Sequence, residues 1–370
     1  MSDGFKTFIT APERDRLDIF LAASRRLGAA LPNVEKDFWV CWTLNVLYHG
    51  LPSGSPRLLF KGGTSLSKAH DLIRRFSEDI DITVFREDLN QAASIEEMEK
   101  LSGKKRRAKL DAIRDACHAW VTGPLHENLA TQIQEFIPGD GRIEVDVDDP
   151  DGQTLVVWYP SIAASEPGYM RPAVRIECGA KSALDPHLSV LIQPYISVDA
   201  PGLDLSVPEV TTIEPSRTLW DKIVIVHGLR RWYEIRGELR YEGQRISRHY
   251  YDLHCLLHST TGIAVTDQAL GYDCVRHARM FFDRPDFDLA AGRPGTFAIK
   301  PNEGMLDSLR RDYANTAPMI FGRAPTPLTR SWSLFRKSMR QSTRSRARAK
   351  ADELKGDATA RNVENTATQQ

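Results

Sequence analysis

The segment from Phe60 to Val84, FKGGTSLSKAHDLIRRFSEDIDITV, constrains the fold of this chain more than any other. An apolar run enters Gly62-Gly63, the pair Thr64-Ser65 then opens a short amphipathic helix, and Asp79-Ile80-Asp81 alternates on an apolar strand. Glycines let backbone come close to a phosphate, and a helix N-terminus presents free N–H groups. Side chains at i and i+2 share one face of a strand, where two carboxylates can hold a divalent metal. The segment therefore combines a possible phosphate-binding turn with possible metal ligands, the two features that phosphoryl or nucleotidyl transfer needs.

Either part alone is more often a plain turn or a solvated strand face, so the specificity comes from their order and spacing. With thirteen residues between Ser65 and Asp79, the segment resembles the polymerase-β-like nucleotidyltransferase superfamily, whose pattern is an apolar residue, Gly, Gly or Ser, a helix, and Asp-x-Asp on a strand. The wider string KGGTSLSK…RFSEDIDI resembles one branch of it, the AbiEii/AbiGii toxin family of bacterial type IV toxin–antitoxin systems. The resemblance implies nucleotide contacts from a segment that consists of Lys61, Gly62, Gly63, Thr64 and Ser65.

Length and composition place the chain among ordinary globular proteins. Its 370 residues suit two domains, and 41% hydrophobic with 26% charged residues is a globular balance. No apolar run approaches the roughly 20 residues that a membrane span needs, and the N-terminus lacks the apolar core of a signal peptide. The five cysteines are scattered and lack CxxC spacing, so we expect reduced thiols, no zinc and no disulfide. We therefore expect a cytoplasmic protein without a membrane partner.

Two basic clusters raise the question of a polyanionic partner, although the net charge is zero. The stretch from Arg323 to Lys350 has nine Arg or Lys residues and no acid. The cluster from Lys104 to Arg107 lies in a charged segment of helical composition. Either cluster can attract RNA electrostatically, but a solvated tail and a solvated helix face are the favoured interpretations.

Apolar periodicity in the N-terminal half predicts a sheet with helices around it. Helices are predicted over residues 11–29 and from Pro32 onward; the string VEKDFWVCWTLNVL in the second resembles the N-terminal helix of the toxin family, and we expect it to pack behind the sheet without chemistry. Residues 87–135 have the composition of a charged helical insertion. Alternation in GRIEVDVDD and TLVVWYP around the turn Asp149–Gly152 predicts a β-hairpin, and PAVRIECGAKS predicts a further strand.

After Pro215 the pattern changes to helices, in SRTLWDKIVIVHGLRRWYEI, in GQRISRHYYDLHCLLHST and near residues 265–282. The predicted fold class is α/β. A polymerase-β-like nucleotidyltransferase domain with a small mixed sheet is expected over residues 1–213, and a mainly helical C-terminal domain that closes the cleft over residues 214–324. A basic tail over residues 325–370 has a composition typical of disorder.

Metal chemistry in such an enzyme needs carboxylates from more than one strand. In nucleotidyl transfer two metals bridge the nucleotide phosphates and the attacking hydroxyl, and Mg²⁺ prefers oxygen ligands. Asp79 and Asp81 are the first two predicted ligands. Glu177 is the predicted third, because it alternates on a strand and because VRIECGAK resembles the corresponding block of the toxin family. The alternative set, which the hairpin pattern also fits as a wet strand face, consists of Glu144, Asp146 and Asp148.

Two residues of the helical part complete the predicted site through the resemblance. Lys222 in TLWDKIVIVH matches a lysine of the family's third motif, which implies a phosphate contact; the alternative is a surface residue paired with Glu214 or Asp221. Asp252 in RHYYDL matches the Asp of the fourth motif, which implies that activity needs it. The alternative is an ion pair between Asp252 and Arg248, one helical turn earlier.

The resemblance implies a Mg²⁺-dependent nucleotidyltransferase toxin that moves nucleotides from an NTP to an RNA acceptor, in some relatives the tRNA 3′ end, and that a separate antitoxin protein neutralises. Arg75, beside the carboxylates, can neutralise them or meet the substrate. His249 is expected to be packed rather than titrating. Two alternatives stay open: the same fold acting on a small molecule or a protein, and a non-catalytic nucleotide-binding module.

Overall fold

The computed structural model describes residues 3–137, 139, 141–163, 171–240, 245–316 and 319–320. The predicted tail over residues 325–370 and the basic stretch from Arg323 to Lys350 lie outside the described residues. Within the described part, seven strands form a mixed sheet in the order β3-β4-β5-β2-β1-β7-β6. The strands are β1 (Leu58–Lys61), β2 (Asp79–Val84), β3 (Arg142–Val145), β4 (Thr154–Trp158), β5 (Ala173–Gly179), β6 (His187–Ile192) and β7 (Val207–Ile213).

The two motif strands occupy the middle of this sheet. β2 pairs antiparallel with β1 and parallel with β5, while β1 pairs parallel with β7. The predicted hairpin is confirmed as β3 and β4, and β4 continues antiparallel to β5. Phe60, Ile80 and Ile82 are fully buried, because the central strands are covered on their apolar face. The mixed sheet of the predicted α/β class is therefore confirmed.

Helices pack around the sheet and make up most of the C-terminal half. The described residues form α1 (Asp3–Thr10), α2 (Glu13–Leu27), α3 (Leu31–His49), α4 (Gly62–Lys68), α5 (Ile95–Lys100), α6 (Gly103–Trp120), α7 (His126–Phe136), α8 (Pro215–Arg236), α9 (Ser247–His258), α10 (Gln268–Phe281) and α11 (Glu303–Thr316). The predicted helical insertion over residues 87–135 becomes α5, α6 and α7, and a π-helical turn around Pro124 joins the last two. Helices α1 and α11 were not predicted.

Local chemistry explains where several of these helices begin and end. Ser94 and Glu97 form a capping box at the start of α5, so two otherwise unpaired N–H groups are bonded. Pro215 occupies the first turn of α8, where its missing N–H is not needed. Gly237 ends α8 with φ of 73°, the left-handed conformation that glycine adopts without strain. Such signals depend on a few neighbouring residues, which is why the sequence reveals them.

Two main clusters of buried apolar side chains form the core. One joins α1–α3, the sheet and α6–α7, and Phe5, Phe8, Phe20 and Phe38 pack together within it. The other lies among α8–α11. The clusters interlock, because Leu66 of α4 belongs to the second. The predicted domain boundary after residue 213 coincides with the end of β7, and the division into domains stays a prediction.

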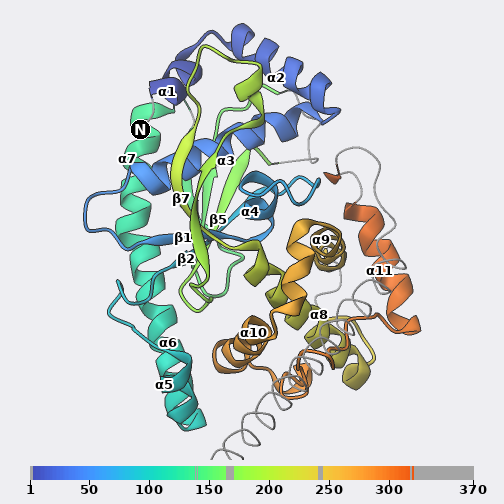
Figure 1. Cartoon of the computed structure of the whole chain (residues 1–370). Coiled ribbons are helices and arrows are strands. Elements are labelled where there is room, and N and C mark those ends of the chain that lie inside the picture. Colours follow the sequence, from blue (N-terminus) through green and yellow to red (C-terminus); the bar gives the residue numbers. More distant parts are fainter. Residues whose placement is uncertain are drawn as a thin grey trace, which may run out of the picture.

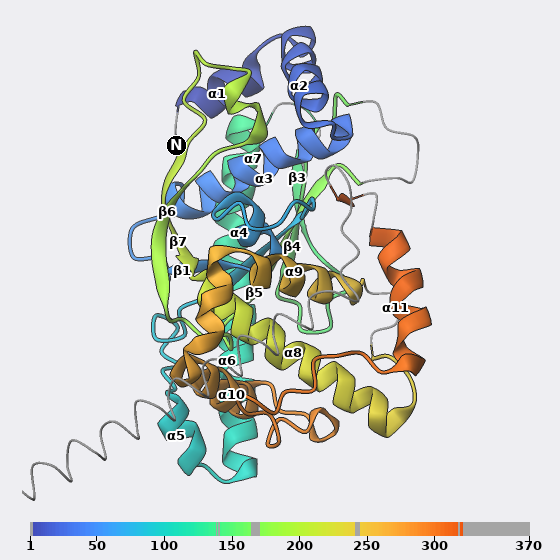
Figure 2. The same ribbon diagram turned by 45° about the vertical axis from the view of Figure 1, so that its right-hand side comes forward.

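Strands β1 and β2, which carry the glycine turn and the Asp-x-Asp motif, lie next to the C-terminal helices. Helix α3 packs against β2, β5 and β7, and the column of α6 and α7 runs along the sheet (Figure 1). Helix α10 contacts α5 and lies beside α6 in the turned view (Figure 2). The helical insertion over residues 87–135 therefore contacts the C-terminal helices. None of the helices in the described part of the chain combines the length and the apolar character that a bilayer crossing requires.

Candidate active site

The sheet register places the three predicted metal carboxylates on one face. On the parallel pair β2–β5, Asp81 lies opposite Glu177, and Asp79 lies opposite Arg175. On the antiparallel pair β1–β2, Lys61 lies opposite Asp81. Because residues at i and i+2 of a strand share a face, the three carboxylates share one surface with the two cations. The pairing of β2 with β5 thus brings the predicted third carboxylate beside the Asp-x-Asp strand.

Gly62 and Gly63 are needed where the chain turns from β1 into α4, because other side chains of the site lie against them. Gly62 has φ of +81°, in the left-handed region, and a Cβ there would lie 1.9 Å from Asp81 Oδ2. A Cβ on Gly63 would lie 2.3 Å from Arg75 Nη2. The pair therefore permits the close approach of a carboxylate and a guanidinium to the backbone.

Thr64 and Ser65 lie deeper than the prediction assumed. Helix α4 begins at Gly62 rather than at the Thr64-Ser65 pair, and both side chains are fully buried. The hydroxyl of Thr64 donates to the carbonyl oxygen of Asp79, and Ser65 Oγ donates to that of Gly62 over 3.0 Å. Their hydroxyls are thus used inside the fold. Of the side chains predicted to contact a nucleotide, only that of Lys61 lines the cavity. The backbone of Gly62 and Gly63 also lines it and can contact a phosphate.

The carboxylate face carries more negative charge than its neighbours neutralise. Burial raises the pKa of Asp79, and the adjacent acids add to this shift. Burial, followed by the charges of Asp81 and Asp79, raises the pKa of Glu177 to about 7. Lys61 Nζ lies 3.8 Å from Asp81 Oδ1, Arg175 Nη1 lies 3.3 Å from Glu177 Oε1, and the charge of Arg248 also acts on Glu177. Such a surface favours an additional cation.

A divalent metal fits this chemistry, although the side chains do not form a finished cage. Within the described ranges, no group of three His, Cys, Asp or Glu side chains is arranged to hold a metal ion. Glu177 is instead paired with Arg175, which also binds Asp146 at 2.8 Å. Mg²⁺ commonly uses one or two protein carboxylates together with waters and substrate phosphates. Asp79 and Asp81 meet that requirement, whereas the predicted convergence of three carboxylates is not preformed.

Asp252 is a buried anchor for two cations from distant parts of the chain. Its side chain is 0% exposed, and Arg75 binds it through Nε to Oδ1 at 2.7 Å and Nη2 to Oδ2 at 2.9 Å. Lys222 Nζ lies 2.8 Å from Oδ2. Burial opposes the ionised carboxylate, but Arg75 and Lys222 outweigh it and keep the pKa of Asp252 below its usual range. One carboxylate thus holds two cations at the junction of the sheet and helices α8 and α9.

The alternative ion pairs considered for these helices are wrong. Lys222 binds Asp252 rather than Glu214 or Asp221, and Asp252 is bound by Arg75 and Lys222 rather than by Arg248. The reason is tertiary: the carboxylate points to the junction with the sheet, where a residue 177 positions away in the sequence meets it. The sequence interval of one helical turn therefore suggested the wrong partner.

Arg248 is the candidate that the sequence argument missed. It lines the cavity described below, and none of the ion pairs among the described residues includes it. Beside it, burial and the charges of Lys222 and Arg248 lower the pKa of His249 well below the usual value, so this imidazole is neutral at physiological pH. The Nδ1 atom of His249 has no hydrogen-bond partner in the described part of the chain. The Arg248 guanidinium has no direct ion-pair partner among the described residues, although its charge acts on Glu177, and beside a neutral imidazole it favours an anionic ligand.

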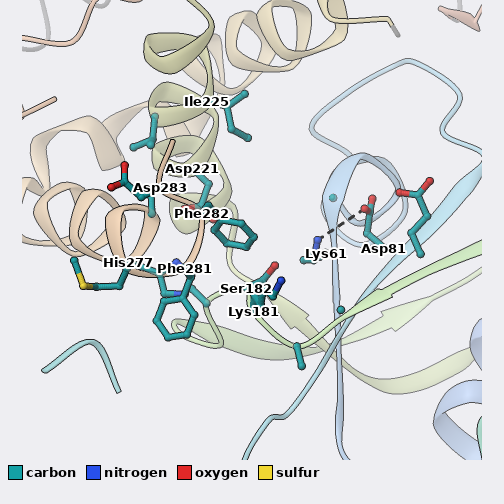
Figure 3. Close-up of a pocket in the computed structure, with 18 of the residues that line it drawn as sticks. Lys61, Asp81, Lys181, Ser182, Asp221, Ile225, His277, Phe281, Phe282 and Asp283 are labelled. Atoms are coloured by element: carbon teal, nitrogen blue, oxygen red, sulfur yellow. Dashed lines mark ion pairs between the residues drawn. The ribbon is translucent and has the colours of Figure 1, made fainter. Parts of the chain in front are cut away.

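The carboxylate face and these cations open into one cavity of about 1290 Å³. Its walls come from the glycine turn, β5 with the loop after it, α6, and α8–α10. Lys61 and Asp81 lie on one side of it, and His277, Phe281 and Phe282 lie on the other (Figure 3). Single small-ligand sites typically have about 300–1,000 Å³. The cavity is therefore large enough for more than one small molecule.

The alternative carboxylates of the hairpin do not line this cavity. Glu144 is exposed, pairs with Arg142 and accepts a hydrogen bond from Trp158 Nε1. Asp146 binds Arg175 and thereby supports the strand that carries the predicted third ligand. Asp148 is exposed. The solvated strand face that the pattern indicated is thus observed for two of the three.

Helix α3 supports the site from behind with three consecutive buried charges. Glu35 accepts hydrogen bonds from Ser161 and from the backbone of residues 162 and 163. Lys36 binds Glu78, the residue before Asp79, at 2.8 Å. Asp37 binds Lys68 at the end of α4 at 2.7 Å. None of the three lines the cavity, so this helix fixes the neighbouring segments, as the prediction of packing without chemistry implies.

A mixed sheet with an Asp-x-Asp strand beside a glycine turn, facing a cation-lined cavity, defines this protein as a nucleotidyltransferase. The family model "Nucleotidyl transferase AbiEii toxin, Type IV TA system" matches residues 45–341, and the chain belongs to this family. It is therefore a nucleotidyltransferase toxin of a type IV toxin–antitoxin system, with an NTP as substrate and an antitoxin as partner. The predicted family and enzyme class are confirmed.

One solved structure and the curated proteins complete the comparison. The nucleotidyltransferase toxin MenT4 from Mycobacterium tuberculosis H37Rv is 17% identical in sequence, with a TM-score of 0.42 over 87% of this chain and 97% of that one. Among the curated proteins, none matches the chain.

Proposed function

We propose that the enzyme transfers nucleotides from an NTP to an RNA acceptor, the 3′ end of tRNA, in the cytoplasm and with Mg²⁺. The observation that supports this most is the row Lys61–Asp81–Glu177 across three strands, beside a cavity with unpaired cations. A row of carboxylates suits a metal, and cations beside it suit a triphosphate. A non-catalytic nucleotide-binding module would not need both a metal-binding row of carboxylates and cations for a triphosphate.

In this proposal Asp79 and Asp81 hold the metal and Glu177 handles the proton. Bound Mg²⁺ would neutralise charge on the phosphates. Glu177, with its pKa raised to about 7, accepts the proton of the acceptor hydroxyl, because a general base works best with a pKa near the operating pH. The hydroxyl oxygen then bonds to the α-phosphorus, and the bond to the β-phosphate oxygen breaks. The electron pair of that bond leaves with pyrophosphate.

The cations divide between binding and positioning. Arg248 and Lys61 line the cavity and are assigned to the triphosphate. Lys222 is assigned to the same ligand as a point charge that Asp252 holds in place at 2.8 Å. Arg75 is a positioning residue, since its Nε and Nη2 bind Asp252 and its Nη1 donates to the carbonyl oxygen of Phe76 at 3.5 Å. Its Nη2 also lies 2.3 Å from where a Cβ on Gly63 would be.

The alternative of a small cationic acceptor, such as an aminoglycoside, is disfavoured by the charge of the cavity wall. Such a ligand needs an acidic pocket, but α6 contributes Lys104, Arg106, Arg107 and Arg114 to this cavity. Polyanions are attracted to surfaces of this kind. The balance therefore favours RNA.

The proposal is tested by incubating the purified full chain with each of the four labelled NTPs, Mg²⁺ and tRNA. Labelled RNA is expected with at least one NTP, and prior removal of the tRNA 3′ end should abolish it. EDTA should stop the reaction, and added Mg²⁺ should restore it. Labelling of protein or of a small molecule in a cell extract, with tRNA unlabelled, would contradict the RNA acceptor.

Replacing Glu177 by Gln should stabilise the metal-free protein at pH 8. The pKa of about 7 in the folded state lies above the ordinary 4.5, so the folded state binds a proton more readily than the unfolded chain. This stability is fully present below pH 4.5 and is lost as the pH rises through 7. Since Gln imitates the protonated form, the Glu177→Gln variant should melt higher than the wild type at pH 8, and the difference should shrink steadily as the pH falls to 5.

The measurement is thermal unfolding in EDTA between pH 5 and 8, with Glu144→Gln as the matched control. Glu144 is an exposed acid on the same sheet, outside the cavity, so its replacement should leave the pH dependence of melting unchanged. A Glu177→Gln variant that melts below the wild type at pH 8 would show that Glu177 is not repelled by its neighbours.

A further inference from the structure

Helix α6 presents cations to the cavity from a different wall than the carboxylates. Lys104 and Arg107 are exposed residues near its start, and both line the cavity together with Lys181, which follows β5. Among the described residues, Arg114 is the only cation of α6 in an ion pair, and Lys181 is in none. These three cations, called the basic lip below, are therefore available to a ligand. The solvated helix face that was the favoured interpretation of Lys104–Arg107 fits the exposure of Lys104, Lys105 and Arg107, and Lys104 and Arg107 in addition line the cavity.

The position of Lys104 and Arg107 near the N-terminus of α6 does not stabilise this helix. The first turn of α6 has no acid, and cations near a helix N-terminus oppose the helix dipole. The preceding helix α5 has the stabilising order instead, with Glu96 and Glu97 in its first turn and Lys100 in its last. Cations placed against the dipole beside a cavity favour an anionic partner at that position.

The basic lip is held firmly against the rest of the site. Helix α6 packs against β5, the strand of Glu177, and the side chain of Gln153 donates to the carbonyl oxygen of Arg114 at 2.8 Å. On the other side, Arg276 of α10 binds Glu96 and Glu99 of α5 at 2.9 and 2.8 Å. The insertion is thus fastened to both walls of the cavity, which matches the neighbourhood of α5, α6 and α10 in Figures 1 and 2.

An aromatic surface accompanies the cations. Phe282 is 47% exposed although it lines a cavity rich in charge, and Ile225, which lines the same cavity, is 39% exposed. Figure 3 shows Phe282 on the same side of the cavity as Phe281 and away from Asp81. Exposed aromatic rings next to cations are the usual platform for an unpaired base, because every base has a face that stacks.

We propose that the basic lip and Phe282 bind the single-stranded end of the acceptor RNA. The lip takes the backbone phosphates, Phe282 stacks an unpaired base, and the terminal hydroxyl is thereby directed toward the carboxylates. This inference rests on the proposed function, since it names where the acceptor of that reaction lies. A single strand of RNA offers both phosphates for the cations and unpaired bases for the ring, whereas the NTP has its own cations in Arg248 and Lys222.

The first test is the double variant Lys104→Glu/Arg107→Glu in the full chain. Its KM for tRNA should rise at least tenfold, while kcat at saturating tRNA and the KM for NTP stay within about twofold of the wild type. The slope of log KM against log salt concentration should become shallower by about 0.7 for each lost phosphate contact. The matched control is Lys105→Glu, an exposed lysine between the two that does not line the cavity, and it should behave as the wild type.

The second test concerns the ring. Phe282→Ala should raise the KM for tRNA roughly tenfold without changing the KM for NTP, and Phe282→Trp should restore it, because stacking needs an aromatic face. A rise in the KM for NTP instead would assign Phe282 to the nucleotide and overturn its place in the inference. Rescue by Leu as good as by Trp would indicate packing rather than stacking.

Direct binding separates this inference from the proposed function. Fluorescence anisotropy of labelled tRNA with the Asp79→Ala protein needs no catalysis, and the lip substitutions should weaken binding at least tenfold. Binding that depends on the lip, with no transfer to RNA by the wild type, would keep the lip and overturn the proposed reaction. An equal loss of tRNA affinity in the lip variant and in Lys105→Glu, or no loss in either, would contradict the proposal that the basic lip binds RNA.

Discussion

Asp79→Ala should lower kcat/KM for nucleotide transfer roughly 10³-fold, with little change in stability. Metal-mediated charge stabilisation supplies several kcal/mol to the transition state, and each 1.36 kcal/mol is about tenfold in rate. The fold should tolerate the change, because the Asp79 side chain is repelled by the neighbouring acids and its pKa is raised by burial. The hydrogen bond from Thr64 goes to the backbone oxygen of residue 79 and survives.

The measurement is single-turnover transfer of labelled nucleotide, with thermal unfolding of the same preparation. Asp81→Asn should show a loss of similar size, since both carboxylates lie on the same strand face. Glu144→Gln, an acid of the same sheet outside the cavity, should keep full activity. Transfer within tenfold of the wild type in Asp79→Ala would remove this residue from the mechanism.

Asp252→Ala should destabilise the protein by about 3–5 kcal/mol, the usual effect of removing one partner of a buried ion pair. Arg75 and Lys222 would remain buried without a counter-charge, since their side chains are only 6% and 9% exposed. Activity should fall as well, because Lys222 loses the group that fixes its position. Urea unfolding followed by circular dichroism measures the first effect, and transfer below the unfolding range measures the second.

Two further variants separate folding from catalysis. Lys222→Met keeps the bidentate Arg75–Asp252 pair, so it should lose activity with a much smaller loss of stability. Glu234→Gln breaks partly exposed pairs with Arg230 and Arg231 on α8 and should change stability by less than about 1 kcal/mol. A stability loss in Asp252→Ala no larger than in Glu234→Gln would contradict the anchoring role.

Much of the fold follows from local patterns. Alternation predicted the β3–β4 hairpin and the strand of Glu177, and apolar spacing predicted α2, α3 and α8–α10 within a few residues. Helix α11 was not predicted, because a moderately apolar helical pattern between loops gives a weak signal. The start of α4 was placed two residues late, since glycine is a poor helix former and a Gly-Gly pair indicates a turn rather than a helix.

The sequence predicted which residues belong to the candidate site, but not which ion pairs connect them. Asp79, Asp81 and Glu177 were grouped from the motif and the family resemblance, and the sheet register places them together. The ion pairs considered as alternatives for Asp252 and Lys222 were wrong, because helical spacing describes neighbours on one helix and not charges from another segment. Arg248 and the cations of α6 were undervalued for the same reason: exposure and pairing depend on what packs nearby.

The order of residues alone determined which strands alternate, where the glycine turn lies and which family the chain belongs to, since these depend on neighbours within a few positions. Only the tertiary structure decided that Arg75 reaches a carboxylate on α9, that Lys104 and Arg107 face the same hollow as Glu177, and that Thr64 is used inside the fold. Burial and charge pairing are properties of segments brought together across long distances in the chain, and no local pattern encodes them.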